Sequence, residues 1–283
     1  MFDQYDRIRI VNLKHRKDRR VEMLRELRRV GLRNDPRVAF VEAFAFPDAG
    51  GFRGIGSHGN FHTQLQILEE AADAGESVLI LEDDCDFALG AEGYALPWDC
   101  DVFYGSYQSA TPGDLENGDV IGSHFMGFSK SGANAAAIYL RSLLQPNYAP
   151  DSRAAAEPSY RADIRPSIDG AYVWFRRAHP EMKTVFAVPA LGHQRASRSD
   201  CARNRFFDVL PGLKQAASAV RVARREVGRF AQHQPAVWAR ILAPVQQRSR
   251  AASLVGLPGR AGKKSLRRLI RTVRPSGSRR SPW

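Results

Sequence analysis

One stretch of the chain indicates the fold class most clearly: Ser77-Val78-Leu79-Ile80-Leu81-Glu82-Asp83-Asp84-Cys85-Asp86-Phe87. The continuous apolar run from Val78 to Leu81 is typical of a strand that is buried on both faces of a parallel sheet. The run ends abruptly in closely spaced acids, Glu82, Asp83, Asp84 and Asp86. Because open α/β sheets bind their ligands at the carboxyl ends of strands, the sequence predicts a binding site here.

These acids indicate a cation site. Carboxylates so close together raise each other's pKa unless a cation neutralises them, and a hard divalent ion with oxygen ligands, Mn²⁺ or Mg²⁺, fits them. Strand side chains alternate, so Glu82 and Asp84 are expected on one face and Asp83 on the other. A solvated acidic loop is the alternative that the residues alone leave open. A P-loop site is excluded, because the sequence has no Gly-x-x-x-x-Gly-Lys-Ser/Thr motif.

Strands and helices are expected to alternate through the first 210 residues, which predicts an α/β/α sandwich of the Rossmann type. The first predicted helix begins with Asp18 as its N-cap, turns Val21, Leu24 and Leu27 toward the sheet, and ends at Gly31. A second predicted helix ends at Gly75. The other predicted strands cover residues 7–13, 38–44, 101–104, 125–128 and 184–188, and the other helices begin near residues 131 and 166.

Charge divides the chain into two parts. Residues 211–283 hold 17 Lys and Arg side chains against one acid, Glu226, whereas residues 1–210 hold 25 basic and 29 acidic side chains. We therefore expect one domain over residues 1–210 and a basic extension over residues 211–283, built of short amphipathic helices or partly disordered. Such an extension suits an anionic inner-membrane surface. Nucleic-acid binding is ranked last, because the body is acidic and carries no known reader motif.

The three cysteines, Cys85, Cys100 and Cys201, are too few and too scattered for a disulfide framework or a zinc site, and they fit a reducing compartment. The sequence has no apolar signal region at its N-terminus and no run of 18 apolar residues. We expect a cytoplasmic protein, peripheral on the inner face of the cytoplasmic membrane through its basic extension.

Several stretches together resemble glycosyltransferase family 25, the group of lipopolysaccharide and procollagen galactosyltransferases. The opening motif of that family resembles residues 10–20, and its Leu-Glu-Asp-Asp signature is similar to residues 79–84. Three further stretches resemble family motifs in the family's order, namely Gly59 to Leu65, Gly127 to Leu144, and Ile168-Asp169. The resemblance covers roughly residues 5–205.

This resemblance implies a GT-A-like fold and a metal-dependent hexosyltransferase. The donor would be a nucleotide sugar, such as a UDP-hexose, and the acceptor a saccharide or lipid-linked saccharide in the synthesis of lipopolysaccharide or surface polysaccharide, with inversion at the transferred sugar. The sequence departs from the family at Thr63-Gln64, where the family has Ser-His. The alternative is therefore a catalytically inactive nucleotide-sugar-binding or scaffold protein with a basic tail that binds membranes or nucleic acid.

Candidate donor-binding residues come from the family motifs and from arginines near the strand ends. Arg16 and Arg19 lie at a strand-to-helix turn, where phosphates are often held. Glu82 would meet the ribose, and Asp83 would orient the site. Arg195 and Arg198 would clamp the diphosphate once the polar stretch 111–122 closes as a lid. The full donor-binding set is Asn12, Leu13, Arg16, Arg19, Thr63, Gln64, Glu82, Asp83, Arg195 and Arg198.

Asp84, Asp86 and His193 are the candidate metal ligands. Asp86 is also compatible with a solvent-side position that plays no part in the site. Asp169 is the candidate general base for the acceptor hydroxyl, which inverting transfer needs on the side opposite the leaving group. Its alternative role is a plain helix N-cap.

Overall fold

The computed structural model describes residues 1–109, 111, 113–116 and 118–195. The basic extension over residues 211–283, the domain boundary after residue 210 and Arg198 all lie outside the described residues. None of the helices in the described part of the chain is long and apolar enough to cross a membrane.

A six-stranded mixed sheet forms the centre of the fold. From one edge to the other its strands are β2 (Val38–Glu42), β1 (Arg7–Asn12), β3 (Val78–Glu82), β8 (Phe125–Phe128), β5 (Val102–Tyr104) and β9 (Thr184–Phe186). β1 runs parallel to β2 and β3, and β5 runs parallel to β9. β8 is antiparallel to both of its neighbours, so the expected parallel sheet is a mixed one.

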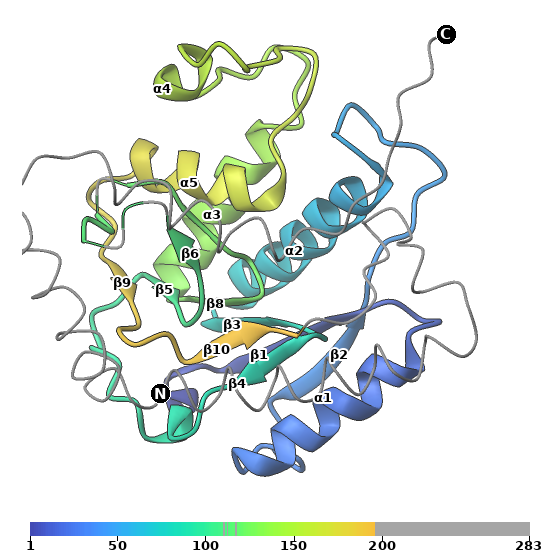
Figure 1. The fold of residues 1–283 in the computed structure, drawn as a ribbon, viewed down its shortest axis with the longest axis vertical. Helices are drawn as coiled ribbons and strands as arrows, with labels where there is room; N and C mark the ends of the chain where they lie inside the picture. The colour runs from blue at the N-terminus through green and yellow to red at the C-terminus, as the bar shows by residue number, and fades with distance from the viewer. Residues whose placement is uncertain (110, 112, 117, 196–283) are drawn as a thin grey trace, which may run out of the picture. The chain divides into compact units, whose positions relative to one another are not determined.

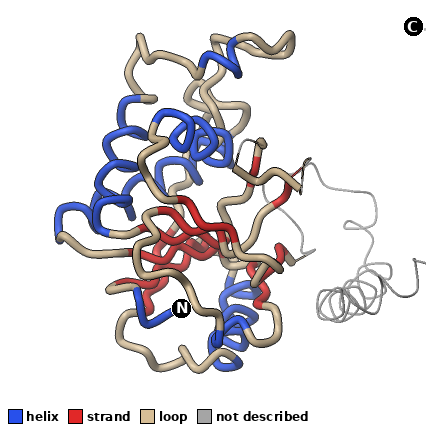
Figure 2. The backbone as a smooth tube through the Cα atoms, turned by 90° about the vertical axis from the view of Figure 1, so that its left-hand side faces the viewer, coloured by secondary structure: helices blue, strands red, loops and turns tan. Residues whose placement is uncertain are grey.

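Helices cover both faces of this sheet, as Figures 1 and 2 show. One face carries α1 (Lys17–Arg29), and the other carries α2 (Ile55–Ala74), α3 (Lys130–Ser142) and α5 (Ile168–Ala178). The remaining short helices are α4 (Ser152–Ala155) and two 3₁₀ turns, η1 (Phe2–Gln4) and η2 (Ala91–Gly93). The result is a mixed α/β fold compatible with the Rossmann type.

β3 is buried on both faces, as the apolar run predicts. Val78 and Ile80 pack into the core on the α2, α3 and α5 side, whereas Leu79 and Leu81 pack into the core on the α1 side. All four side chains are completely buried. The strand lies between β1 and β8, so its carboxyl end opens near the middle of the sheet.

Two small antiparallel pairs flank that end of β3. β4 (Cys85–Phe87) follows the acids directly and pairs with β10 (Gly192–Gln194), which is the last described strand. β6 (Gln108–Ser109) and β7 (Val120–Ile121) form a hairpin arm after β5 (Figure 1). These two pairs rise on either side of the acids and supply walls for a cavity.

The helix predictions are only partly correct. α2 ends as expected at Gly75, whose positive φ of 64° suits glycine at a helix C-terminus. α1 begins earlier than predicted, with Arg16 and not Asp18 at the N-cap position. Val21 and Leu24 are 49 % and 37 % exposed, because the buried face of α1 is formed by Arg19, Met23, Glu26 and Leu27.

Candidate functional site

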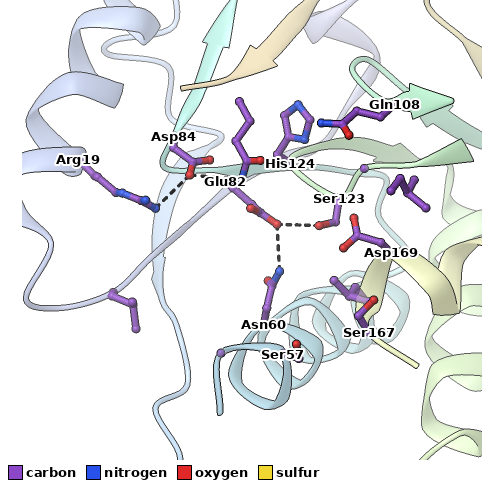
Figure 3. A pocket seen from close by; sticks show the side chains of 16 residues that line it. Arg19, Ser57, Asn60, Glu82, Asp84, Gln108, Ser123, His124, Ser167 and Asp169 are labelled. Atoms are coloured by element: carbon purple, nitrogen blue, oxygen red, sulfur yellow. Dashed lines mark hydrogen bonds and ion pairs between the residues drawn. The ribbon is translucent and has the colours of Figure 1, made fainter. Parts of the chain in front are cut away.

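A cavity of about 370 Å³ lies at the carboxyl end of β3 (Figure 3). Its walls come from the ends of β1 and β3, the first turns of α1, α2 and α5, the hairpin arm and β10. The lining residues are Leu13, Arg19, Gly56, Ser57, Asn60, Glu82, Asp84, Gln108, Ile121, Gly122, Ser123, His124, Ser167, Ile168, Asp169 and Gln194.

Glu82 is held in place by amides and a hydroxyl. Its Oε1 accepts hydrogen bonds from Ser123 Oγ at 2.7 Å, Asn60 Nδ2 at 3.0 Å and Gln64 Nε2 at 3.3 Å. Burial, and next the charge of Asp84, raise the pKa of Glu82 to about 7. The hydrogen bonds therefore fix the orientation of the carboxylate, and its raised pKa means that a nearby positive charge would stabilise its ionised form.

Asp84 lines the same cavity and is buried. Its Oδ2 lies 3.1 Å from Arg19 Nη1 and 3.4 Å from Gln194 Nε2. Its buried Oδ1 accepts no hydrogen bond from the described residues. Burial raises the pKa of Asp84 to about 6 although Arg19 lowers it. A buried carboxylate oxygen without a donor is suited to a bound cation.

Asp83 turns away from this cavity, as strand alternation predicts. Its Oδ2 accepts a hydrogen bond from Asn12 Nδ2 at 2.6 Å, and its Oδ1 lies 2.8 Å from Arg19 Nη1. Arg19 thus contacts both Asp83 and Asp84 and carries its positive charge at the wall of the cavity. The three successive acids are separated into a pair that faces the cavity and a third that holds Asn12 and Arg19.

A smaller and more apolar cavity of about 240 Å³ adjoins the first. The two share Leu13, Arg19, Gly56, Asn60 and Glu82 as lining residues. The smaller cavity extends over aromatic and aliphatic side chains, among them His15, Phe44, Phe46 and Ile55. An acidic compartment and an apolar one therefore share a common wall.

Asp169 faces Glu82 across Ser123 (Figure 3). It lies in the first turn of α5, but the N-cap is Ser167, whose side chain accepts the hydrogen bond from the Gly170 amide. The alternative N-cap role for Asp169 is therefore wrong. Burial raises the pKa of Asp169, while hydrogen bonds from Ser123 and from backbone amides act in the opposite direction.

Asp86 and Arg195 form a buried ion pair outside both cavities. Arg195 Nη2 lies 2.5 Å from Asp86 Oδ1, and Arg195 Nη1 lies 2.6 Å from Glu22 Oε2 on α1. Asp86 is completely buried, so the solvent-side position expected for it is wrong. The guanidinium that was a candidate diphosphate clamp is held by carboxylates and joins β10, β4 and α1.

His193 accompanies this pair on β10, with its Nε2 3.7 Å from Asp86 Oδ2. Neither His193 nor Asp86 lines the cavity that contains Asp84, so the three candidate metal ligands do not form one set. The Arg195 amide donates to the Asp84 carbonyl at 2.6 Å. The β4–β10 pair therefore positions Asp84 through the backbone.

The other candidate donor-binding residues are divided between the cavity wall and its support. Leu13 lines both cavities, whereas Arg16 pairs with Asp18 at 2.9 Å. Thr63 is completely buried, and its hydroxyl donates to the Gly59 carbonyl and accepts from the Phe44 amide. Thr63 therefore joins α2 to the strand end beside it and does not reach the cavity.

Gln64 helps to position Glu82 through hydrogen bonds. Tyr172 donates its hydroxyl to Gln64 Oε1 at 2.8 Å, which turns the Gln64 amide nitrogen toward Glu82. The residue that departs from the family pattern is thus satisfied on both sides and contributes to fixing Glu82.

Several cavity residues were not found by sequence reasoning, namely Ser57, Asn60, Gln108, Ser123, His124 and Gln194. Asn60 lies within the Gly59 to Leu65 stretch that resembles a family motif, so the sequence contained a signal for it. Ser123 and His124 follow the hairpin arm, and nothing local marks them. His124 Nε2 lies 2.8 Å from Ser106 Oγ, and burial lowers the His124 pKa to about 4, so the ring is neutral near pH 7.

Glu82 and Asp84 suit a divalent cation. Mg²⁺ and similar ions bind one or two protein carboxylates when phosphate and water oxygens complete the coordination, and these two carboxylates face one cavity. Asp84 Oδ1 is the oxygen that the described residues leave without a hydrogen-bond donor. Within the described ranges there is no group of three or more His, Cys, Asp or Glu side chains placed to hold a metal.

No family model matches the chain, and no curated protein matches it either.

The metal-free protein should lose stability as the pH rises through the range in which Glu82 and Asp84 titrate. Their folded-state pKa values of about 7 and about 6 exceed the ordinary 4.5 and 3.8, so the folded chain binds more protons between about pH 4 and 7. The free energy of unfolding then falls with rising pH, by about 3 kcal/mol for Glu82 alone. Urea unfolding in EDTA at pH 5 and pH 8 measures this loss.

Glu82→Gln is the control for this pH effect, because an amide oxygen still accepts from Ser123 and Asn60 but does not ionise. The variant should be more stable than the wild type at pH 8 and nearly equal to it at pH 5. Since other titrating groups are common to both proteins, only the difference between them is interpreted. Parallel pH profiles for the two proteins would show that burial of Glu82 does not raise its pKa.

Proposed function

We propose that this chain is a metal-dependent glycosyltransferase with a GT-A-like arrangement, which transfers a hexose from a nucleotide-sugar donor to a saccharide hydroxyl. The observation that carries the proposal is one cavity, at the carboxyl end of a central buried strand, in which Glu82 and Asp84 lie opposite Asp169 (Figure 3). Two carboxylates suited to a cation and one half-buried carboxylate across from them match the needs of donor activation and proton removal.

The donor fits the two adjoining cavities. The apolar cavity, with Phe44 and Phe46, suits a nucleoside, and the acidic cavity suits the diphosphate and hexose. Arg19 lines both and offers its guanidinium to phosphate oxygens where they meet. Asp84 and Glu82 would hold Mn²⁺ or Mg²⁺, which would offset the negative charge that develops on the leaving nucleoside diphosphate.

Asp169 is the proposed general base. Burial raises its pKa, which makes its carboxylate a stronger proton acceptor than an exposed aspartate. Ser123 lies between Asp169 and Glu82 and donates its hydroxyl hydrogen to Glu82. In the proposed reaction Asp169 takes the proton of the acceptor hydroxyl as that oxygen attacks the hexose from the side opposite the diphosphate, which inverts the anomeric carbon.

The family 25 resemblance supports the same activity and adds a biological setting, the synthesis of lipopolysaccharide or surface polysaccharide with a saccharide or lipid-linked acceptor. Its main departure, Thr63-Gln64, is compatible with an active site because Gln64 donates to Glu82 and accepts from Tyr172. We therefore favour an active enzyme over an inactive nucleotide-sugar-binding protein.

Release of UDP from a donor tests this proposal. UDP-galactose, UDP-glucose and UDP-N-acetylglucosamine are incubated separately with the full chain and Mn²⁺, with and without EDTA. We expect one of them to be hydrolysed slowly in the absence of acceptor, and EDTA to stop this release. If none of the three is hydrolysed and none stabilises the protein thermally, the transferase proposal fails.

A further inference from the structure

A separate cavity of about 640 Å³, called the second cavity below, is lined by a later part of α5. The cavity that contains Glu82, Asp84 and Asp169 is called the first cavity. The same two elements contribute to both. Ile168 and Asp169 at the start of α5 line the first cavity, and Val173, Trp174 and Arg177 line the second. The hairpin arm likewise contributes Ile121 and Gly122 to the first cavity and Gly118 and Asp119 to the second. The other lining residues of the second cavity are Thr111 and Asp114, between β6 and β7, and members of the stretch 153–160.

The spacing along α5 places the two cavities one after the other along the helix. Asp169, Val173 and Arg177 recur at intervals of four residues and so share one face of the helix. At 1.5 Å per residue, Arg177 lies about 12 Å along the helix axis from Asp169.

The side chains of the second cavity combine aromatic surface with charged groups. Trp174 and Tyr160 line it, and the Tyr148 ring stands beside Trp174 with the ring centroids 6.5 Å apart. Arg177 is fixed by ion pairs with Asp151, at 2.7 Å, and with Asp119. Arg153 and Glu157 are exposed at the edge. Aromatic faces suit the C–H faces of sugar rings, and fixed charged groups suit their hydroxyls.

We infer that this second cavity binds the saccharide chain of the acceptor, with Tyr160 as its more exposed aromatic side chain and Arg153 at its edge. The inference rests on the proposed function, because it assigns the acceptor hydroxyl to Asp169. Sugar units behind the reacting one then lie along α5, and the cavity selects an oligosaccharide over a monosaccharide.

Saturation-transfer NMR with lactose, maltotriose, cellotriose and chitotriose, each added separately to the full chain, tests this inference. Tyr160→Ala and Arg153→Ala are the test variants, and Arg153 is an exposed residue. Trp98→Ala is the matched aromatic control, since Trp98 is 91 % exposed and lines neither cavity. We expect at least one oligosaccharide to bind the wild type and the control equally, and about fivefold more weakly to both test variants.

The outcome is separable from that of the proposed function, because UDP-hexose with Mn²⁺ is measured on the same samples by thermal stabilisation. Donor stabilisation should be unchanged in Tyr160→Ala and Arg153→Ala. If no oligosaccharide binds, or if binding is equal in all variants, the acceptor assignment is overturned even when the donor binds. Oligosaccharide binding that depends on Tyr160 while every donor fails supports a saccharide site here and contradicts the transferase proposal alone.

Discussion

Asp169→Asn is expected to abolish sugar transfer while the protein continues to bind its nucleotide-sugar donor. The asparagine keeps the size of the side chain, but its amide cannot take a proton from the acceptor hydroxyl. Loss of a general base typically costs on the order of 10²–10⁴-fold in rate. The measurements are kcat for transfer to acceptor and the donor Kd with Mn²⁺, and only kcat should change.

Asp163→Asn is the matched control for this prediction. Asp163 lies in the segment before α5, is exposed, and pairs with Arg161 at 2.6 Å outside both cavities. This variant should transfer sugar at the wild-type rate. If Asp169→Asn retains most of its turnover, Asp169 is not the base, and its burial beside Ser123 has only a structural role.

Asp84→Asn is expected to remove the stimulation of turnover by Mn²⁺. The substitution replaces the buried carboxylate whose Oδ1 has no hydrogen-bond donor among the described residues with a neutral amide. A divalent ion at the leaving diphosphate supplies several kcal/mol of transition-state stabilisation, so turnover should fall by roughly 10²–10³-fold. A Mn²⁺ titration of UDP release measures the effect, and the residual rate should be independent of Mn²⁺.

Asp73→Asn makes the same chemical change on the exposed part of α2 and should leave the Mn²⁺ titration unaltered. Thermal unfolding of Asp84→Asn in EDTA gives a second readout. Because burial raises the pKa of Asp84, its neutral replacement should stabilise the metal-free protein at pH 8. Retained Mn²⁺ stimulation in Asp84→Asn would place the metal elsewhere.

The central strand and the arrangement of its acids could be predicted because both follow from local rules. A continuous apolar run indicates burial on both faces, and β3 is buried in that way. Side-chain alternation predicts that Glu82 and Asp84 separate from Asp83, and only the first two line the cavity that contains Asp169. The end of α2 at Gly75 is likewise a local signal.

The direction of β8 and the partners of the buried charges could not be predicted, because they depend on contacts between distant parts of the chain. Nothing within Phe125 to Phe128 distinguishes an antiparallel strand from a parallel one. Arg195 pairs with Asp86 across 109 residues of sequence, and Tyr172 donates to Gln64 across 108. Arg195 therefore has the sequence position of a phosphate clamp, although its guanidinium pairs with Asp86 and Glu22 within the fold.

The buried face of α1 shows the same limit at closer range. Val21 and Leu24 were assigned to the sheet because they are apolar, yet Arg19 and Glu26 occupy buried positions instead. Arg19 is buried because it contacts Asp83 and Asp84, and Glu26 because it accepts from the Phe87 amide at 3.2 Å. Charged residues with buried partners therefore occupy buried positions of α1, and a prediction from apolar residues alone assigns the wrong face to the sheet.

Calorimetric titration of UDP-hexose into the full chain, with Mn²⁺ and then with EDTA, measures whether the sugar nucleotide binds through a metal ion. We expect UDP-hexose to bind in Mn²⁺ and its affinity to fall at least tenfold in EDTA. The affinity in Mn²⁺ should fall to the same extent in Asp84→Asn. Binding that is equal with and without the metal, or no binding of any UDP-hexose in Mn²⁺, would contradict the assignment of Glu82 and Asp84 to a metal-bound sugar nucleotide.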